Sequence, residues 1–185
     1  MTPHSRRLRF RRVDTTDLEE LWRLWTEAAV RQFLWDDRVI SRDEAASTIA
    51  NCESLAARDL GLWVLRPTDS DVLIGCAGLF PVTTAATYEP RLAGLVEPLI
   101  ALAPEYWGRG YASEALRALI DHAASHLGLT QLAAVTDVPN VRSDRMLRRA
   151  GFVELSETDG PRYRLRTYGY TAKGNSRGRR RARSE

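Results

Sequence analysis

A turn broken by two glycines carries the clearest chemical pattern of the chain. The turn is Trp107-Gly108-Arg109-Gly110-Tyr111, and apolar residues recur behind it at helical spacing, at positions 112, 115, 116, 119, 120 and 123. Glycines let a backbone bend sharply and approach a ligand closely. The first amides of a helix have no acceptor inside it and, together with the helix dipole, they favour an anion such as phosphate. The turn is therefore either a phosphate cradle or a tight strand-to-helix connection whose glycines serve geometry only.

Two other groups of residues have types and spacings that could support chemistry. Trp35 precedes Asp36 and Asp37 in a connector; an aromatic beside paired acids either lines a pocket for a cationic substrate or forms a packing corner between helices. Trp35 and Asp36 are the substrate contacts we expect. His122 and His126 lie four residues apart on one helix, a spacing that can bind a metal. The sequence offers them no evident third ligand, so we expect surface positions for both and no metal site.

The elements that must position these residues alternate between short strands and helices. Capping boxes predict two early helices, one at Thr16 with Glu19 and one at Ser41 with Glu44. Proline cannot donate to a strand ladder, so Pro98 predicts a bulge or a sheet edge. Strands are expected at residues 7–13, 61–66, 72–80, 95–102, 131–136, 152–155 and 162–168, and helices behind the two capping boxes, behind the glycine turn and at residues 141–150.

The length and composition are those of one soluble globular domain, which we expect to span residues 6–170. No apolar run approaches the length of a membrane span, and the basic N-terminal segment lacks the apolar core of a signal peptide. We therefore expect a cytoplasmic protein. Cys52 and Cys76 lie in apolar patterns and are expected to be buried thiols rather than a disulfide.

The positive charge is concentrated in the C-terminal segment, residues 171–185. This segment holds six of the Lys and Arg residues and one Glu, so the formal net charge of +3 leaves the rest of the chain near −2. Its Gly, Ser and Arg content, with almost nothing apolar to bury, predicts disorder. The segment either holds RNA, for example at a ribosome, by sequence-independent attraction, or it is a solvated end that aids solubility.

The order of elements and four stretches of sequence resemble the GNAT superfamily of acyl-CoA-dependent N-acetyltransferases, and within it the ribosomal-protein N-acetyltransferase branch (RimJ/RimL type). The stretches are RLRFRRVDTTDLEELWRL, FLWDDRVISRDEA, VEPLIALAPEYWGRGYASEAL and NVRSDRMLRRAGF. They sample the chain from about residue 7 to residue 168. The resemblance implies an α/β (α+β) GNAT fold: a mixed, mostly antiparallel central sheet flanked by helices and splayed between its fourth and fifth strands.

The resemblance also implies acetyl-CoA as the acyl donor. Its pyrophosphate would lie on the amides of the glycine turn, and its pantetheine arm would pair like an added strand with residues at the splay. A backbone N–H of that strand would face the thioester carbonyl and stabilise the developing oxyanion. The amide donors are Gly108, Arg109, Gly110, Tyr111 and Ala112, and the strand residues are Ile100, Ala101 and Leu102.

The helix at residues 141–150 supplies the other coenzyme contacts that the resemblance implies. Asn140 would cap this helix and touch the pantetheine arm. Arg145, with Arg148 and Arg149, would offer positive charge to the 3′-phosphate; the alternative is a solvated helix face.

The chain departs from the family pattern at two positions. In many relatives the phosphate loop begins with Gln or Arg three residues before its first glycine, where this chain has Glu105. The tyrosine that many members use as a general acid falls at Leu147. The branch commonly shows a serine in an Asn-x-x-Ser pattern instead, here Ser143. That serine would donate a proton or a hydrogen bond to the departing thiolate, or it would only satisfy backbone groups in the first helical turn.

Glu97 occupies the position where the branch often has a strand glutamate near the amine. An amine attacks only when neutral, and a free α-amino group has a pKa of about 8 whereas lysine lies near 10.4, so a modest base suffices for the former. Glu97 would take that proton directly or through a water. The alternative is an edge carboxylate paired with a surface arginine.

Three functions fit these residues. The first is acetylation of a protein N-terminal α-amine, the second is acetylation of a small amine such as an amino acid, a polyamine or an antibiotic, and the third is acyl-CoA or RNA binding without turnover. The protein would act as a monomer or a homodimer.

Overall fold

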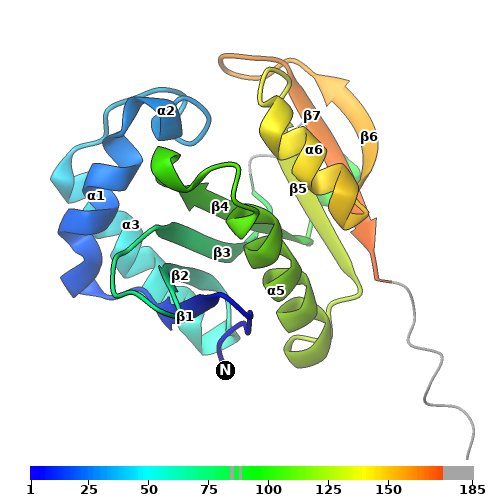
Figure 1. Ribbon diagram of the computed structural model, residues 1–185. Coiled ribbons are helices and arrows are strands. Elements are labelled where there is room, and N and C mark those ends of the chain that lie inside the picture. Colours follow the sequence, from blue (N-terminus) through cyan, green and yellow to red (C-terminus); the bar gives the residue numbers. More distant parts are fainter. Residues whose placement is uncertain (84–85, 88, 173–185) are drawn as a thin grey trace, which may run out of the picture.

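The computed structural model describes residues 1–83, 86–87 and 89–172 (Figure 1). The segment expected to be disordered, residues 171–185, lies outside this part of the chain except for its first two residues. The strands are β1 (Leu8–Arg12), β2 (Gly61–Pro67), β3 (Gly75–Pro81), β4 (Val96–Leu102), β5 (Gln131–Asp137), β6 (Val153–Thr158) and β7 (Leu165–Thr171). The helices are α1 (Leu18–Thr26), α2 (Ala28–Arg31), α3 (Arg42–Leu55), α5 (Tyr111–His126) and α6 (Val141–Ala150).

The strands form two antiparallel sheets that lie next to each other (Figure 1). One sheet has the order β1-β2-β3-β4 and the other has the order β5-β7-β6, so β4 and β5 are adjoining edge strands. The expected architecture, mostly antiparallel strands splayed between the fourth and the fifth and flanked by helices, is confirmed. Pro98 lies in β4 opposite Leu79 of β3, and the register continues on both sides of it. The edge position alone therefore accommodates the proline.

Helices cover both faces of the larger sheet (Figure 1). Successive side chains of a strand point to opposite faces, so buried residues of β2 belong to a cluster on each side of the sheet. On one face Leu116 of α5, Leu147 of α6 and Trp63 of β2 belong to one cluster of buried residues. On the opposite face Ile49 of α3 packs against Val64 of β2 in a cluster that also holds residues of α1. The two layers leave the adjoining edges of β4 and β5 as the place where a ligand can reach backbone.

The caps of the first two helices differ in how well the sequence predicted them. The capping box of Ser41 and Glu44 is present at the start of α3. The predicted box at residues 16–19 is wrong. Asp14 accepts from the N–H of Thr16 at 2.8 Å, and Asp17 accepts from the N–H of Asp14 at 3.0 Å. Two short acidic side chains thus cap a turn of 3₁₀-helix, and α1 begins only behind it.

Cys52 and Cys76 are free and buried, as expected. His122 is not the surface residue that was predicted: it is 2% exposed and lies edge-on to Trp63, with ring centroids 5.6 Å apart. Its position on the apolar face of α5 places it in the core, and spacing to His126 could not reveal this. None of the described helices combines the length and hydropathy that a membrane span requires.

Candidate active-site cleft

A cleft of about 570 Å³ opens where the adjoining edges of the two sheets diverge. Four parts of the chain line it: residues around the end of α2, the last residues of β4, the glycine turn with the start of α5, and the first turns of α6. The segment around α2, the segment from β4 to α5 and the start of α6 are far apart in sequence. The fold therefore assembles, in one cavity, the segments that carry most of the predicted coenzyme contacts.

The glycine turn forms one end of the cleft. Gly108 has φ +74° and Gly110 has φ +81°, backbone conformations that side chains other than glycine rarely adopt. A Cβ placed on Gly108 meets no atom within 4 Å, so that turn residue faces open space. Within the described residues, no acceptor lies in hydrogen-bond geometry to the backbone N–H groups of residues 108–113. Six consecutive free amides at the mouth of α5 are the donors that an anion requires.

The free edge of β4 forms the floor of the cleft, where Ile100, Ala101 and Leu102 all line the cavity. The N–H of Ala103 donates back toward β3, to the carbonyl oxygen of Ile74 at 2.9 Å. Because backbone groups alternate in direction along an edge strand, the groups of Ile100 and Leu102 face away from β3. The carbonyl of Leu102 accepts from Trp107 Nε1 at 2.7 Å, which is consistent with that direction.

The start of α6 forms a third wall. The side chain of Asn140 accepts from the N–H of Ser143 at 3.2 Å and so caps the helix, as predicted. Both residues line the cleft, and the cap uses the backbone of Ser143, which leaves its hydroxyl available.

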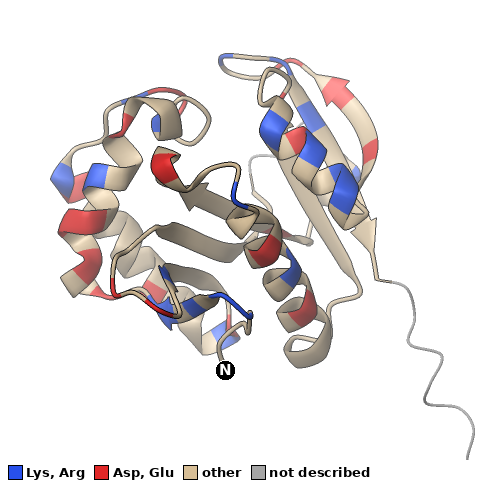
Figure 2. Cartoon of the chain, viewed as in Figure 1, with Lys and Arg blue, Asp and Glu red and all other residues tan. Residues whose placement is uncertain are grey.

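Helix α6 carries several basic residues (Figure 2), and its arginines differ in whether they line the cleft. Arg145 and Arg149 line it, whereas Arg148 is held by Asp144 at 2.7 Å and by Glu154 on the other side of the helix. Of the three arginines predicted to offer charge, Arg148 is therefore already neutralised.

The sequence analysis missed several cleft residues, among them Arg142 and Tyr106. Arg142 lines the cleft, with its guanidinium 4.6 Å from the ring centroid of Trp107. Its spacing to Arg145 and Arg149, at i, i+3 and i+7 on one helix, could have indicated a basic stripe. Tyr106 also lines the cleft, from the short turn before the glycines, and no pattern in the sequence distinguishes it.

Glu97 lies on β4, on the face that Ala101 shares with α1–α3. It does not line the cleft itself. Burial raises the pKa of its carboxyl to about 7. Among the described residues the side chain has neither an ion-pair nor a hydrogen-bond partner, so the alternative of a carboxylate paired with a surface arginine is not observed in this part of the chain.

The structure does not bring Trp35 and Asp36 to the cleft. Trp35 packs edge-on against Trp25, with ring centroids 5.9 Å apart, which is the packing corner that the sequence analysis left open. Asp36 is exposed, in a left-handed backbone conformation at φ +52°. The connector reaches the cleft through its earlier residues Gln32, Phe33 and Leu34, because the turn at Asp36 directs the chain away.

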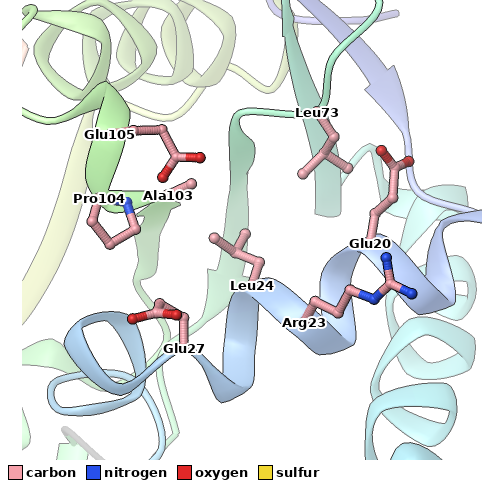
Figure 3. A pocket seen from close by; sticks show the side chains of 8 residues that line it. All are labelled: Glu20, Arg23, Leu24, Glu27, Leu73, Ala103, Pro104 and Glu105. Atoms are coloured by element: carbon pink, nitrogen blue, oxygen red, sulfur yellow. The ribbon is translucent and has the colours of Figure 1, made fainter.

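A second hollow of about 270 Å³ lies between α1 and the residues that follow β4 (Figure 3). Glu20, Glu27 and Glu105 line it together with one arginine, Arg23. The excess of carboxylates makes this hollow unsuitable for a diphosphate, so the cleft described above is the better anion site. The position of Glu105 in this wall also explains how a glutamate is tolerated beside the glycine turn.

The residues of the cleft fit acetyl-CoA. Unpartnered amides and a glycine that faces open space suit a diphosphate, and the free edge of β4 suits an extended amide-bearing arm. Within the described ranges, His, Cys, Asp and Glu side chains do not gather in threes as a metal site requires. Leu147 is 3% exposed in the core, so that position supplies no acid.

Comparisons with known proteins agree with this geometry. Residues 7–153 match the family described as the acetyltransferase (GNAT) domain. An N-acetyltransferase named YoaA from Bacillus subtilis, described as uncharacterised, is 28% identical over 147 residues, which cover 79% of each chain.

Two solved structures share the fold. A GNAT-family acetyltransferase from Bacillus anthracis superposes with a TM-score of 0.75 at 16% identity, covering 92% of this chain and 98% of its own. RimL, a ribosomal L7/L12 α-N-protein acetyltransferase in complex with coenzyme A, superposes with a TM-score of 0.74 at 18% identity, covering 92% and 97%. Since the family match spans most of the chain, the protein belongs to the GNAT family and is an acetyl-CoA-dependent N-acetyltransferase.

Proposed function

We propose that the protein acetylates a protein N-terminal α-amine by direct attack within a ternary complex, as an enzyme of the RimJ/RimL-type branch. The observation that carries this proposal is the half-buried carboxylate of Glu97, which has no ion-pair or hydrogen-bond partner among the described residues and lies on the strand whose free edge floors the cleft. The carboxylate and the thioester site then share one strand, which fixes their relative position.

The coenzyme is held by backbone groups. The N–H groups of Gly108, Arg109, Gly110, Tyr111 and Ala112 receive the diphosphate, and Ile100, Ala101 and Leu102 provide the edge along which the pantetheine arm lies. Acetyl-CoA supplies a thioester whose acyl carbon is the electrophile. The N–H of Ile100 faces the open side of β4 and is the proposed donor to the oxyanion. On α6, Asn140 contacts the arm and Arg145 contacts the 3′-phosphate.

Glu97 is the proposed base, and its pKa favours one class of amine. A carboxylate with a pKa of about 7 lies about 1 unit below an α-amino group and more than 3 units below a lysine or another alkyl amine. Each unit is about 1.4 kcal/mol, so proton removal costs about 1.4 kcal/mol for the α-amine and more than about 4 kcal/mol for the alkyl amine. This difference supports a protein N-terminus as the acceptor.

Ser143 is proposed to assist the leaving group. Its hydroxyl lies in the cleft wall and is not used by the helix cap. A serine is a weak acid, so it donates a hydrogen bond to the departing thiolate or relays a proton through a water.

The acceptor panel tests this proposal. Thiol release from acetyl-CoA is measured with a peptide that has a free N-terminus, with the same peptide blocked at its N-terminus but carrying lysine, with a polyamine and with a free amino acid. Release with the first peptide alone supports the proposal. Preference for the polyamine or the amino acid favours the small-amine function, and stabilisation by coenzyme A without release for any amine favours a binding module.

The remaining proposals concern partners. The predicted contact of the basic segment with RNA or a ribosome falls on residues outside the described part of the chain, and a salt titration of RNA binding with and without residues 172–185 tests it.

A further inference from the structure

Arg7 contacts the glycine turn, although it lies about a hundred residues earlier in the chain. Its Nη1 donates to the carbonyl oxygen of Arg109 at 3.2 Å, and its guanidinium carbon lies 4.6 Å from the ring centroid of Tyr111. A Cβ on Gly110 would lie 3.4 Å from its Nη2. Arg7 is not among the residues that line the cleft, so it contacts the turn from behind.

The same arginine holds the carboxylate of Glu114 in the first turn of α5. Arg7 Nε donates to Glu114 Oε2 at 2.6 Å, the backbone N–H of Arg7 donates to Oε1 at 2.8 Å, and Ser5 Oγ donates to Oε1 at 2.5 Å. Burial raises the pKa of Glu114, but the hydrogen bonds from Ser5 and Arg7 outweigh it and hold the pKa below its ordinary value. The carboxylate is therefore charged at neutral pH.

A charged glutamate at a helix N-terminus has opposite consequences for the fold and for an anionic ligand. It stabilises the helix through the dipole. It also repels a diphosphate that approaches the same amides, because like charges at close range disfavour each other. The free amides of the turn can attract an anion fully only if the charge of Glu114 is balanced, and among the described residues its one ion-pair partner is Arg7.

We propose that Arg7 is a positioning residue for the coenzyme: by pairing with Glu114 and bracing the carbonyl of Arg109, it makes the glycine turn receptive to the diphosphate. Arg7 acts through the turn and does not touch the reacting atoms. The inference rests on the coenzyme binding in the proposed function. It adds Arg7, the residue directly before β1, to the residues on which that binding depends.

A merely structural role for Arg7 makes different predictions. If Arg7 only fastened the N-terminal segment to α5, its loss would lower the melting temperature and weaken every ligand of the cleft alike. If the role is electrostatic, loss of Arg7 weakens the binding only of ligands that carry a diphosphate. Removing the charge of Glu114, which Arg7 balances, then restores that binding.

The experiment measures dissociation constants for coenzyme A and for pantetheine, which lacks the diphosphate, by calorimetry on the full chain. The variants are Arg7→Ala, Arg7→Lys and the double variant Arg7→Ala with Glu114→Gln. Arg9→Ala is the matched control, since Arg9 lies two residues further along the chain, in β1, and pairs with Asp71 at 2.6 Å, away from the turn.

We expect Arg7→Ala to raise the dissociation constant for coenzyme A about tenfold, which is the size of one charge-assisted contact. The dissociation constant for pantetheine should stay within about twofold of the wild-type value. Arg7→Lys retains the charge and should lose less affinity for coenzyme A. In the double variant the dissociation constant for coenzyme A should return to within about threefold of the wild-type value. Arg9→Ala is unchanged. Three results would overturn this inference but not the proposed function. They are equal losses of affinity for both ligands, no recovery of coenzyme affinity in the double variant, and an unchanged coenzyme affinity in Arg7→Ala. A wild-type chain that binds no coenzyme A overturns both it and the proposed function.

Discussion

Asp37 Oδ2 lies 2.9 Å from a guanidinium nitrogen of Arg162, and this ion pair joins the connector behind α2 to the turn between β6 and β7. Arg162 also donates to the carbonyl oxygen of Gln32 at 3.3 Å, and the rings of Phe33 and Tyr163 lie 6.1 Å apart. Gln32 and Phe33 line the cleft. The bridge therefore ties a wall of the cleft to the turn that connects two strands of the second sheet.

This ion pair predicts an effect on KM for the amine acceptor without a matching effect on KM for acetyl-CoA. We expect Arg162→Ala to raise KM for the amine about threefold to tenfold, because a wall that is no longer tied positions the amine less well. Partly exposed ion pairs contribute about 0–1 kcal/mol to stability, so unfolding does not account for such a change. Steady-state kinetics against both substrates measure it. Arg164→Ala is the control, since Arg164 precedes β7 directly and pairs with Glu157 of β6. A parallel rise in KM for acetyl-CoA would contradict the assignment.

Glycine at position 108 should matter for the coenzyme more than for stability. In Gly108→Ala the positive φ costs about 1–2 kcal/mol, and the open space around the Cβ adds no clash. Gly128 is a matched control, because it has φ +65° and also has no atom within 4 Å of a Cβ. We expect both alanine variants to lose similar stability by thermal melting. Only Gly108→Ala should also weaken coenzyme A, and equal affinities in the two variants would show that the turn is not the anion site.

The sequence was most informative where local patterns decide the structure. Gly108, Gly110 and Asn140 occupy the turn and cap that their residue types require. Contacts made across the fold left no local trace: Arg7 reaches Glu114 over more than a hundred residues, and the burial of His122 depends on which face of α5 meets the sheet. Whether Trp35 lines a pocket or packs depends likewise on tertiary packing, which residue spacing does not encode.

Glu97 predicts a pH dependence of both rate and stability. The carboxylate is the basic form, so activity should fall as pH drops through about 7, and Glu97→Gln should remove that limb and lower turnover by up to about a hundredfold. For stability, the raised pKa means that the folded chain binds the proton more tightly than the unfolded chain, whose glutamate titrates near 4.3. Stability is then lost as pH rises from about 4.3 to about 7, by at most about 4 kcal/mol.

Rate profiles and melting temperatures of Glu97→Gln from pH 5 to pH 9 check both parts. The variant should melt at a higher temperature than the wild type above pH 7. Glu105→Gln, in the second hollow, is the control and should keep the wild-type rate profile. A profile for Glu97→Gln that retains the limb near pH 7 would assign the base to another group.

Ser143 and Asn140 can be separated by substitution, because the cap uses the backbone of one and the side chain of the other. Asn140→Ala should destabilise the protein by about 1 kcal/mol through loss of the cap. Ser143→Ala keeps the cap, so its melting temperature should match the wild type while kcat falls, by about tenfold or less, with coenzyme affinity unchanged. Calorimetry and initial rates distinguish the two effects. An unaltered kcat in Ser143→Ala would leave water as the proton donor.

The buried ring of His122 makes stability depend on pH with the opposite sign to Glu97. Neither ring nitrogen has a hydrogen-bond partner within the described residues, and burial, with the nearby His126, lowers the pKa. The charged groups that face it are Asp59, which opposes the shift, and Arg12 and the N-terminal amine, which reinforce it. The unfolded chain binds the proton more readily, so this histidine costs stability as pH falls below about 6.5.

His122→Leu should therefore stabilise the protein, because it removes two buried unpartnered nitrogens at similar volume. An unsatisfied buried polar group costs about 1–3 kcal/mol. Part of that gain should appear at pH 7.5, and the difference from the wild type should widen as the pH is lowered to 5.5. His4→Gln is the control, because His4 is exposed. Urea unfolding at the two pH values measures the difference. A gain for His122→Leu that is the same at both would mean that the ring does not titrate on unfolding, and that packing alone accounts for the change.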